Sequence, residues 1–146
     1  MPVARANRTV AAPVERVWDI VRDPYYLPRW WPRVERVEDV GAGAFTEVLR
    51  SNRGSVVRAD FEVQEQDGAR RRLVWAQRTV GTPFERLLDH SRTTIELAAS
   101  DGGTDVALTL DQRPLGLFPG LGSLLMRRAA RATLREALAE LESLVA

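Results

Sequence analysis

Runs of alternating apolar and polar residues fill the middle of the chain and constrain its fold more than any other feature. In residues 57–63, VRADFEV, every second side chain is apolar and those between are charged. A period of two puts the apolar side chains on one face of a strand. Such runs lie at about 34–40, 44–51, 55–66, 70–80, 84–99 and 104–113, and residues 2–10 read as a first strand. We therefore expect seven strands in a sheet with one apolar face and one solvent-exposed polar face.

Short turn sequences separate these runs. Each is rich in the residues that accept the unusual backbone angles of tight hairpins: 41–43, 52–54, 67–68, 81–83 and 101–103. Strands joined this closely pair with their sequence neighbours, so the pattern predicts an antiparallel meander. The run 84–99 breaks the alternation, because Leu87 and Leu88 are adjacent apolar residues. A β-bulge near Asp89 would account for the break.

Helical periodicity occurs at both ends of the chain. Residues 13–22 form a short amphipathic helix that opens on Pro13, and the proline-rich segment 24–32 allows only a short helical turn. Residues from about 120 to 145 form a long helix, whose apolar stripe is Met126, Ala130, Leu134, Ala137, Leu138, Leu141 and Leu144. A helix of ~25 residues spans ~37 Å, which is long enough to cross a sheet.

These elements predict an α+β architecture in a single domain, residues 1–146. The sheet must cover its apolar face, and the C-terminal helix is the only element large enough to do so. A twisted sheet of this size curls around such a helix, and the two short helices can close one end. Where large side chains do not fill the wedge between helix and sheet, the wedge becomes a pocket.

Three segments carry a resemblance to a known superfamily. The opening RTVAAPVERVWDIVRDPYYLPRWWPRV (8–34), the hairpin RTTIELAASDGGTDVALTL (92–110) and the closing helix resemble the START-like, Bet v 1-like (SRPBCC) superfamily. Its bacterial branch is known as the polyketide cyclase/dehydrase and lipid-transport family. The resemblance implies a helix-grip fold, in which a curved antiparallel seven-stranded sheet surrounds a long C-terminal helix and two short helices follow the first strand. It also implies a cavity for an apolar ligand.

Composition excludes several kinds of chemistry. The chain has no cysteine, so disulfides and thiol catalysis are absent, and all 21 basic residues are arginine, so no lysine can form a Schiff base. His90 is the only histidine. A catalytic zinc site would need further histidine or cysteine ligands, and a serine triad would need His90 beside a reactive serine. We therefore expect no metal and no cofactor. A net charge of +1 gives no general attraction to nucleic acid.

Three polar residues are the candidates for chemistry, although no catalytic set is recognisable. Gln77 and Arg71 share the parity of Trp75, so either could place a polar group in the pocket that a ligand would satisfy. His90 faces either solvent or the pocket, and the suspected bulge decides which, because one extra residue reverses the parity that follows.

The predicted ligand-binding residues are mostly apolar and face inward. Phe61 and Trp75 lie on neighbouring strands and would form walls against which a flat or acyl ligand stacks. Plain core packing explains the apolar members equally well. Of Trp30 and Trp31, one packs under the short helices and the other lies at the cavity mouth. The predicted set is Trp30, Phe61, Leu73, Trp75, Gln77, Phe84, His90, Ile95, Leu108, Met126, Ala130 and Leu134.

Three functions remain open. The first is binding or transport of a hydrophobic small molecule such as a lipid, isoprenoid or polyketide. The second is a polyketide cyclase, aromatase or dehydratase, with His90, Gln77 or Arg71 in the reaction. The third is a non-catalytic regulatory or assembly partner, which would expose an apolar patch at Leu117-Phe118 or Trp31.

The sequence also predicts, in outline, the cellular location of the protein and its contacts. The N-terminus is not a signal peptide and no window is apolar enough to span a membrane, so we expect a cytoplasmic monomer or homodimer. The row Arg127, Arg131 and Arg135 is either a solvated helix face or a transient contact with anionic lipid or an acidic carrier protein. The glycine-rich run 117–123 is either a plain connection or a flexible lip of the cavity.

Overall fold

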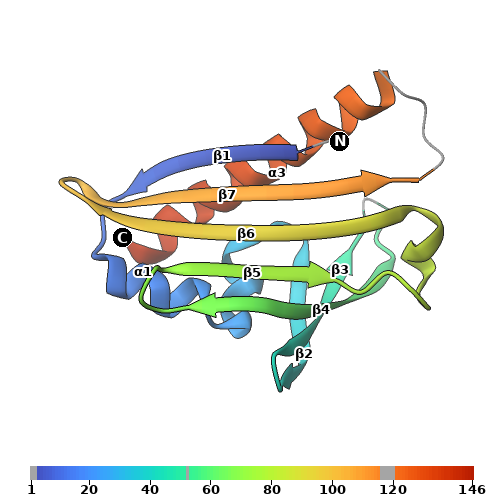
Figure 1. The fold of residues 1–146 in the computed structure, drawn as a ribbon, viewed down its shortest axis with the longest axis horizontal. Coiled ribbons are helices and arrows are strands. Elements are labelled where there is room, and N and C mark those ends of the chain that lie inside the picture. Colours follow the sequence, from blue (N-terminus) through green and yellow to red (C-terminus); the bar gives the residue numbers. More distant parts are fainter. Residues whose placement is uncertain (1–2, 52, 116–120) are drawn as a thin grey trace.

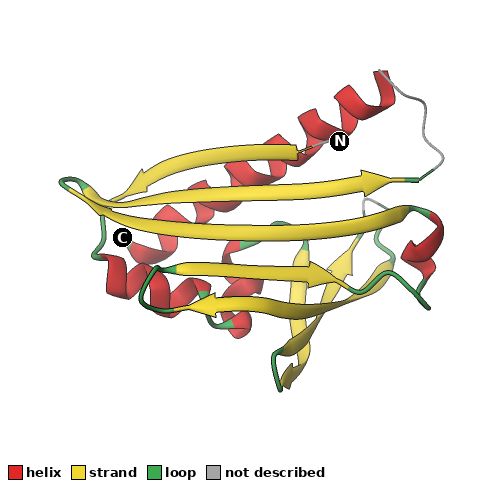
Figure 2. Ribbon diagram, viewed as in Figure 1, coloured by secondary structure: helices red, strands yellow, loops and turns green. Residues whose placement is uncertain are grey.

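A computed structural model describes residues 3–51, 53–115 and 121–146. Within them one sheet lies against one long helix, and several short helices lie beside the sheet (Figures 1 and 2). The elements are β1 Val3–Val10, α1 Val14–Val21, the 3₁₀ helix η1 Pro24–Tyr26, α2 Leu27–Trp30, β2 Val34–Gly41, β3 Ala44–Arg50, β4 Val56–Asp67, β5 Arg72–Gln77, the 3₁₀ helix η2 Pro83–Arg86, β6 Leu88–Ser100, β7 Gly103–Pro114 and α3 Leu121–Val145.

The sheet is antiparallel, and its strand order is β1-β7-β6-β5-β4-β3-β2. Strands β2 to β7 form the predicted meander, and β1 joins its far edge by pairing with β7. Helix α3 runs diagonally across one face, as Figure 1 shows. The helix-grip architecture predicted from the sequence is therefore confirmed.

Two strands differ from their predicted bounds by more than one residue. The run 84–99 does not begin as a strand, because Pro83 starts helix η2 and the Thr82 hydroxyl accepts a hydrogen bond from the Phe84 amide at 3.2 Å. The run 70–80 is a strand only over Arg72–Gln77. Arg71 has a φ of 54° and belongs to the turn that precedes β5. The expected start of the long helix at 120 lies outside the described residues.

The predicted bulge is present. The pairing of β6 with β7 shifts between Leu88 and His90, after which the register runs regularly to the hairpin. Beyond the shift, Ser91, Thr93 and Ile95 are buried on the inner face. His90 therefore points to the opposite, outer face of the sheet.

Helix α3 has two halves with different surroundings. Its C-terminal half buries Leu134, Leu138 and Leu141 completely, in the same core as Val10 and Leu108 of the sheet. Each fully buried leucine contributes about 2 kcal/mol through the apolar surface that it removes from water. Its N-terminal half is more exposed, and small side chains such as Ala129, Ala130 and Ala132 line the space beside the sheet there. The wedge between helix and sheet is therefore filled at one end and hollow at the other.

Candidate functional site

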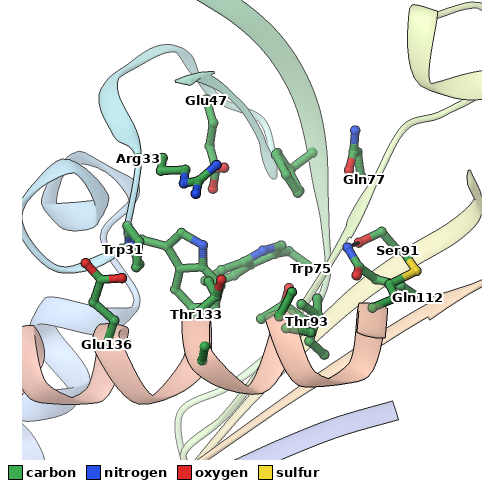
Figure 3. A pocket seen from close by; sticks show the side chains of 17 residues that line it. Trp31, Arg33, Glu47, Trp75, Gln77, Ser91, Thr93, Gln112, Thr133 and Glu136 are labelled. Atoms are coloured by element: carbon green, nitrogen blue, oxygen red, sulfur yellow. Dashed lines mark hydrogen bonds between the residues drawn. The ribbon is translucent and has the colours of Figure 1, made fainter. Parts of the chain in front are cut away.

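A cavity of about 540 Å³ occupies the hollow end of the wedge (Figure 3). Ligand pockets in proteins usually measure about 300–1,000 Å³. Strands β3 to β7 supply its sheet side, and α3 supplies the opposite wall. The cavity opens to solvent along the helix, because Ala129, Ala132 and Glu136 line it and are also exposed.

Aromatic rings form one wall. Phe45 of β3 stacks on Phe61 of β4 with ring centroids 5.3 Å apart, because the two residues are direct partners in the sheet. Trp75 of β5 meets the Phe45 ring edge-on at 5.7 Å and the Trp31 ring at 6.1 Å. Phe61, Trp75 and Trp31 face the cavity. The wall is a rigid apolar surface on which a flat or chain-like ligand could lie.

Glu47 of β3 is a carboxylic acid within this apolar setting. It lies opposite Ala59 in the sheet, on the inner face, and only 4% of it is exposed. No side chain among the described residues forms a hydrogen bond or ion pair with it. Burial raises the pKa of Glu47 from 4.5 to about 8, because the ionised carboxylate would lose its contact with solvent. Near neutral pH the acid is therefore mostly protonated.

Other polar groups line the cavity on β5, β6, β7 and α3. The Gln112 amide donates to the Ser91 hydroxyl at 3.3 Å, across a pair of directly opposed residues (Figure 3). The Nε2 of Gln77, in contrast, is buried without a partner. Thr93, Thr133 and the charged side chains of Arg33 and Glu136 complete the polar lining. An unpaired amide nitrogen costs about 1–3 kcal/mol, so Gln77 is an unfavourable feature of the cavity as it stands.

The structure places the twelve predicted ligand-binding residues in several different surroundings. Five line the cavity: Phe61, Trp75, Gln77, Met126 and Ala130. Leu73, Ile95, Leu108 and Leu134 are at most 2% exposed and pack in the core instead. Phe84 is half-buried in η2, outside the cavity lining. The sequence identified the inner face, but it did not show where along the wedge the core ends and the hollow begins.

Of the two adjacent tryptophans, the predicted ligand-binding set includes Trp30, but it is Trp31 that lines the cavity. Trp30 is 1% exposed and does not line the cavity, whereas Trp31 is half-buried and does. Helix α2 ends at Trp30, and Trp31 has an extended backbone with φ −91° and ψ 127°. That change of conformation turns the second indole toward β5 while the first stays under the helix.

Two of the three candidates for chemistry lie elsewhere. His90 is on the outer face, with Nε2 3.2 Å from Asp111 Oδ1 and Nδ1 3.4 Å from Asp89 Oδ2. Arg71 forms an ion pair with Glu15 and lies over the ring of Trp18 at 6.0 Å. The parity argument was wrong for Arg71, because this residue belongs to the turn and not to the strand. Only Gln77 of the three lines the cavity.

Sequence reasoning missed several lining residues, although a signal for them exists. Glu47 shares the parity of Phe45 within AFTEVLR, and a charged residue on the apolar face of a strand is itself unusual. Ser91 and Thr93 share the parity of Ile95, and the bulge had to be placed before this could be read. The suggested patch at Leu117-Phe118 lies outside the described residues, as do residues 117–120 of the suggested lip.

The described residues also bear on metal binding and on membrane crossing. No group of three or more His, Cys, Asp or Glu side chains there is arranged to hold a metal ion. No helix in the same part of the chain has the length and hydropathy needed to cross a membrane.

Comparisons with known proteins agree with this geometry. A family model described as polyketide cyclase/dehydrase and lipid transport matches residues 1–146. A search of curated proteins found no match. Among solved structures, the di-domain ARO/CYC protein BexL from the BE-7585A biosynthetic pathway is 27% identical, with a TM-score of 0.79, over 98% of this chain and 46% of its own.

Two more distant structures share the fold. An aromatase/cyclase, Zhui, from Streptomyces sp. R1128 is 18% identical, with a TM-score of 0.78, over 98% of this chain and 92% of its own. A START superfamily protein from Mycobacterium smegmatis is 16% identical, with a TM-score of 0.79, over 98% and 96%. Because the family model matches the whole of residues 1–146, the chain belongs to the polyketide cyclase/dehydrase and lipid transport family.

Proposed function

We propose that this protein binds a hydrophobic small molecule, such as a lipid, isoprenoid or polyketide, in the cavity between α3 and the sheet. The observation that carries the proposal is the combination of an aromatic wall with buried polar groups that have no partner. Glu47 and the Gln77 amide both lower the stability of the empty protein. A cavity that served packing alone would be filled with apolar side chains, as the other end of the wedge is.

The dimensions and lining of the cavity favour a ligand with an apolar body that also carries polar groups. Trp31, Phe61, Trp75 and Met126 offer apolar surface from both walls. Eight of the seventeen lining residues are polar or charged, and polar side chains in such a site fix the orientation of a bound molecule. The family description names lipid transport and polyketide cyclisation, and both involve molecules of this kind.

A cavity-filling variant tests this proposal. Ala130→Phe places a phenyl ring in the cavity from α3, and Ala99→Phe makes the same change at an exposed position near the β6–β7 hairpin. The probe is N-phenyl-1-naphthylamine, a neutral dye whose fluorescence rises in apolar surroundings. We expect the wild type and Ala99→Phe to bind the dye equally and Ala130→Phe to lose at least about tenfold in affinity. Equal binding by all three proteins would place the dye elsewhere and contradict the proposal.

A second candidate function is catalysis of cyclisation or dehydration of a polyketide-like substrate, and buried Glu47 favours it. In an intramolecular aldol condensation, an α-carbon loses a proton and attacks a ketone carbon, and the ketone oxygen gains a proton. Loss of water then forms a double bond. A buried protonated acid that faces the cavity can supply the proton that the oxygen requires. BexL, which shares 27% identity over this domain, carries the description ARO/CYC.

Mass spectrometry distinguishes the two functions. A binding protein returns a linear poly-β-ketone thioester unchanged, apart from the slow spontaneous reaction seen without protein. An enzyme accelerates the loss of water, and Glu47→Gln slows that loss while leaving the substrate bound. If wild type and Glu47→Gln give equal rates above the spontaneous one, Glu47 has no part in the reaction.

A further inference from the structure

We propose that Glu47 is the ligand's polar anchor: in its protonated form it donates a hydrogen bond to a neutral oxygen acceptor, such as a ketone or ester carbonyl, and it excludes ligands that bring a carboxylate to the same place. The inference rests on the proposed function, because it concerns the ligand of the same cavity. It adds the chemical class of the ligand's polar end and the proton on which binding depends.

The surroundings of Glu47 leave its carboxyl group facing the cavity. Its direct neighbours in the sheet are Val37 of β2 and Ala59 of β4, and neither carries a polar side chain. Glu47 lines the cavity together with the aromatic wall (Figure 3). A ligand lying on Phe61 and Trp75 would therefore bring its end to this carboxyl group.

Each element packed against Glu47 carries charged side chains, but none of these described side chains forms an ion pair with the Glu47 carboxyl group. On β4, Arg58 forms an ion pair with Glu38 of β2, and Asp60 accepts a hydrogen bond from Thr46, all on the outer face. Within the cavity lining, the other charged residues are Arg33, which precedes β2, and Glu136 of α3. Both are exposed, and neither forms an ion pair or hydrogen bond with Glu47 in the part of the chain that is described.

The protonation state decides what the group can bind. A neutral carboxylic acid has one O–H to donate, and in the unoccupied cavity no described side chain accepts it. A ligand carbonyl oxygen would accept that bond without adding charge. A ligand carboxylate would place a second acidic group at a position where burial already keeps Glu47 neutral. Such a ligand should therefore bind less well than one with a carbonyl group.

Four probes of nearly equal shape separate these possibilities. They are naphthalenes substituted at position 2 with acetyl, isopropyl, carboxylate or 1-aminoethyl, which present a ketone, a hydrocarbon, an anion and a cation. Binding to the full chain is measured by calorimetry from about pH 6 to about pH 10, a range that spans the Glu47 titration. The isopropyl probe reports on the apolar cavity alone, and the other three report on the group that meets Glu47.

Below about pH 8 we expect the ketone to bind about three- to tenfold more tightly than the hydrocarbon, and the carboxylate more weakly than both. Above that pH the affinity for the ketone should fall by up to about tenfold per pH unit, as Glu47 loses the proton that it donates, while the hydrocarbon changes much less. Glu47→Gln retains an N–H donor and no titration, so ketone binding should become independent of pH. Glu47→Met has no donor, so the ketone should bind like the hydrocarbon.

The outcomes distinguish this inference from the function on which it rests. If the hydrocarbon and the ketone bind equally at every pH, the cavity binds apolar molecules but Glu47 is not the anchor. If the amine binds most tightly and improves as the pH rises, Glu47 acts as a carboxylate for a cation, and the inference is overturned. If none of the four probes binds, the proposed function fails and this inference fails with it.

Discussion

The indole of Trp31 meets the indole of Trp75 edge-on, with ring centroids 6.1 Å apart and ring planes at 67°. The contact joins the segment before β2 to the middle of β5 and forms part of the cavity wall. On its other side, Trp31 meets Trp30 at 5.4 Å and 80°. One indole of the adjacent pair thus belongs to the cavity, and the other belongs to the core beneath α2.

This division predicts that one alanine variant mainly loses stability and the other mainly loses ligand binding. Trp30→Ala should lower the free energy of unfolding by about 3–5 kcal/mol, because it opens a void in the core. Trp31→Ala should lower it by only about 1–2 kcal/mol but weaken binding of an apolar probe at least about tenfold, because a wall of the cavity is removed. Urea denaturation and dye titration of both variants measure the two effects.

Each tryptophan variant is the control for the other. Trp30→Ala, where it remains folded, should bind the dye nearly as well as the wild type. The assignment would be reversed if Trp30→Ala lost binding and kept its stability.

The fold could be predicted because its signals are local and repeated. Each strand shows a period of two, each turn has Gly, Asn or Asp where a tight turn needs them, and the apolar stripe of α3 is continuous. Residues such as Leu108 and Leu134 were therefore placed correctly on inward faces. Their burial in the core follows from where α3 lies closest to the sheet, and that distance is a property of the whole fold.

The site could be predicted only in part, because its residues depend on single backbone events. The bulge near Asp89 decides that Ser91 faces inward and His90 outward. The left-handed conformation of Arg71 takes its side chain out of the strand's parity. The end of α2 decides which tryptophan faces the cavity. Each event shifts one or two residues, and periodicity over a whole segment does not resolve shifts of that size.

Glu47 should make the stability of the protein depend on pH. Its pKa is about 8 in the folded protein, against 4.5 without burial. Between these values the folded state binds the proton more tightly than the unfolded state, so stability falls as the pH rises. The protonated form of Glu47 makes the folded protein more stable than the ionised form does. This difference in the free energy of unfolding is fully present below about pH 4.5, declines between about pH 4.5 and about pH 8, and is lost above about pH 8. The total change is about 5 kcal/mol.

Glu47→Gln isolates this effect, because it removes the titration and nearly keeps the shape. We expect the variant to gain stability relative to the wild type as the pH rises from about 5 to about 9, by several kcal/mol. Urea denaturation at each pH measures the difference between the two proteins. Glu140→Gln is the matched control, since Glu140 is exposed on α3 and should give a nearly constant difference. A flat difference for Glu47→Gln would show that water or a counter-charge reaches the carboxylate.

The two glutamine side chains of the cavity should respond in opposite directions to the same change. Gln77→Leu removes an amide nitrogen that has no partner, so the free energy of unfolding should rise by about 1–2 kcal/mol. Gln112→Leu removes the donor of the 3.3 Å bond to Ser91 and leaves that buried hydroxyl without it, so stability should fall by about 1 kcal/mol. Thermal and urea denaturation of the ligand-free proteins measure both values. A loss of stability in Gln77→Leu would mean that its amide is already satisfied, for example by water.

The β6–β7 hairpin meets the end of β1 at Gly103, and this contact sets where the chain leaves the sheet for α1. The Thr104 hydroxyl donates to the Ala12 carbonyl at 2.7 Å, and both residues are buried. Gly103 has a φ of 131°, and a Cβ placed there would lie 2.1 Å from the Val10 carbonyl oxygen. Only glycine fits between the hairpin and the backbone of Val10.

Gly103→Ala should therefore lower the free energy of unfolding by at least about 2 kcal/mol, because both the backbone angle and the clash oppose it. Gly102→Ala is the matched control one residue earlier, where a Cβ would make an ordinary 3.6 Å contact with the Thr9 methyl group. Its effect should stay within about 1 kcal/mol. Because the clash involves backbone atoms of β1 and not a movable side chain, the chain can relieve it only by displacing β1 from β7. Hydrogen exchange should then show faster exchange for the amides of β1 in Gly103→Ala than in Gly102→Ala, and equal protection of β1 in the two variants would contradict this account.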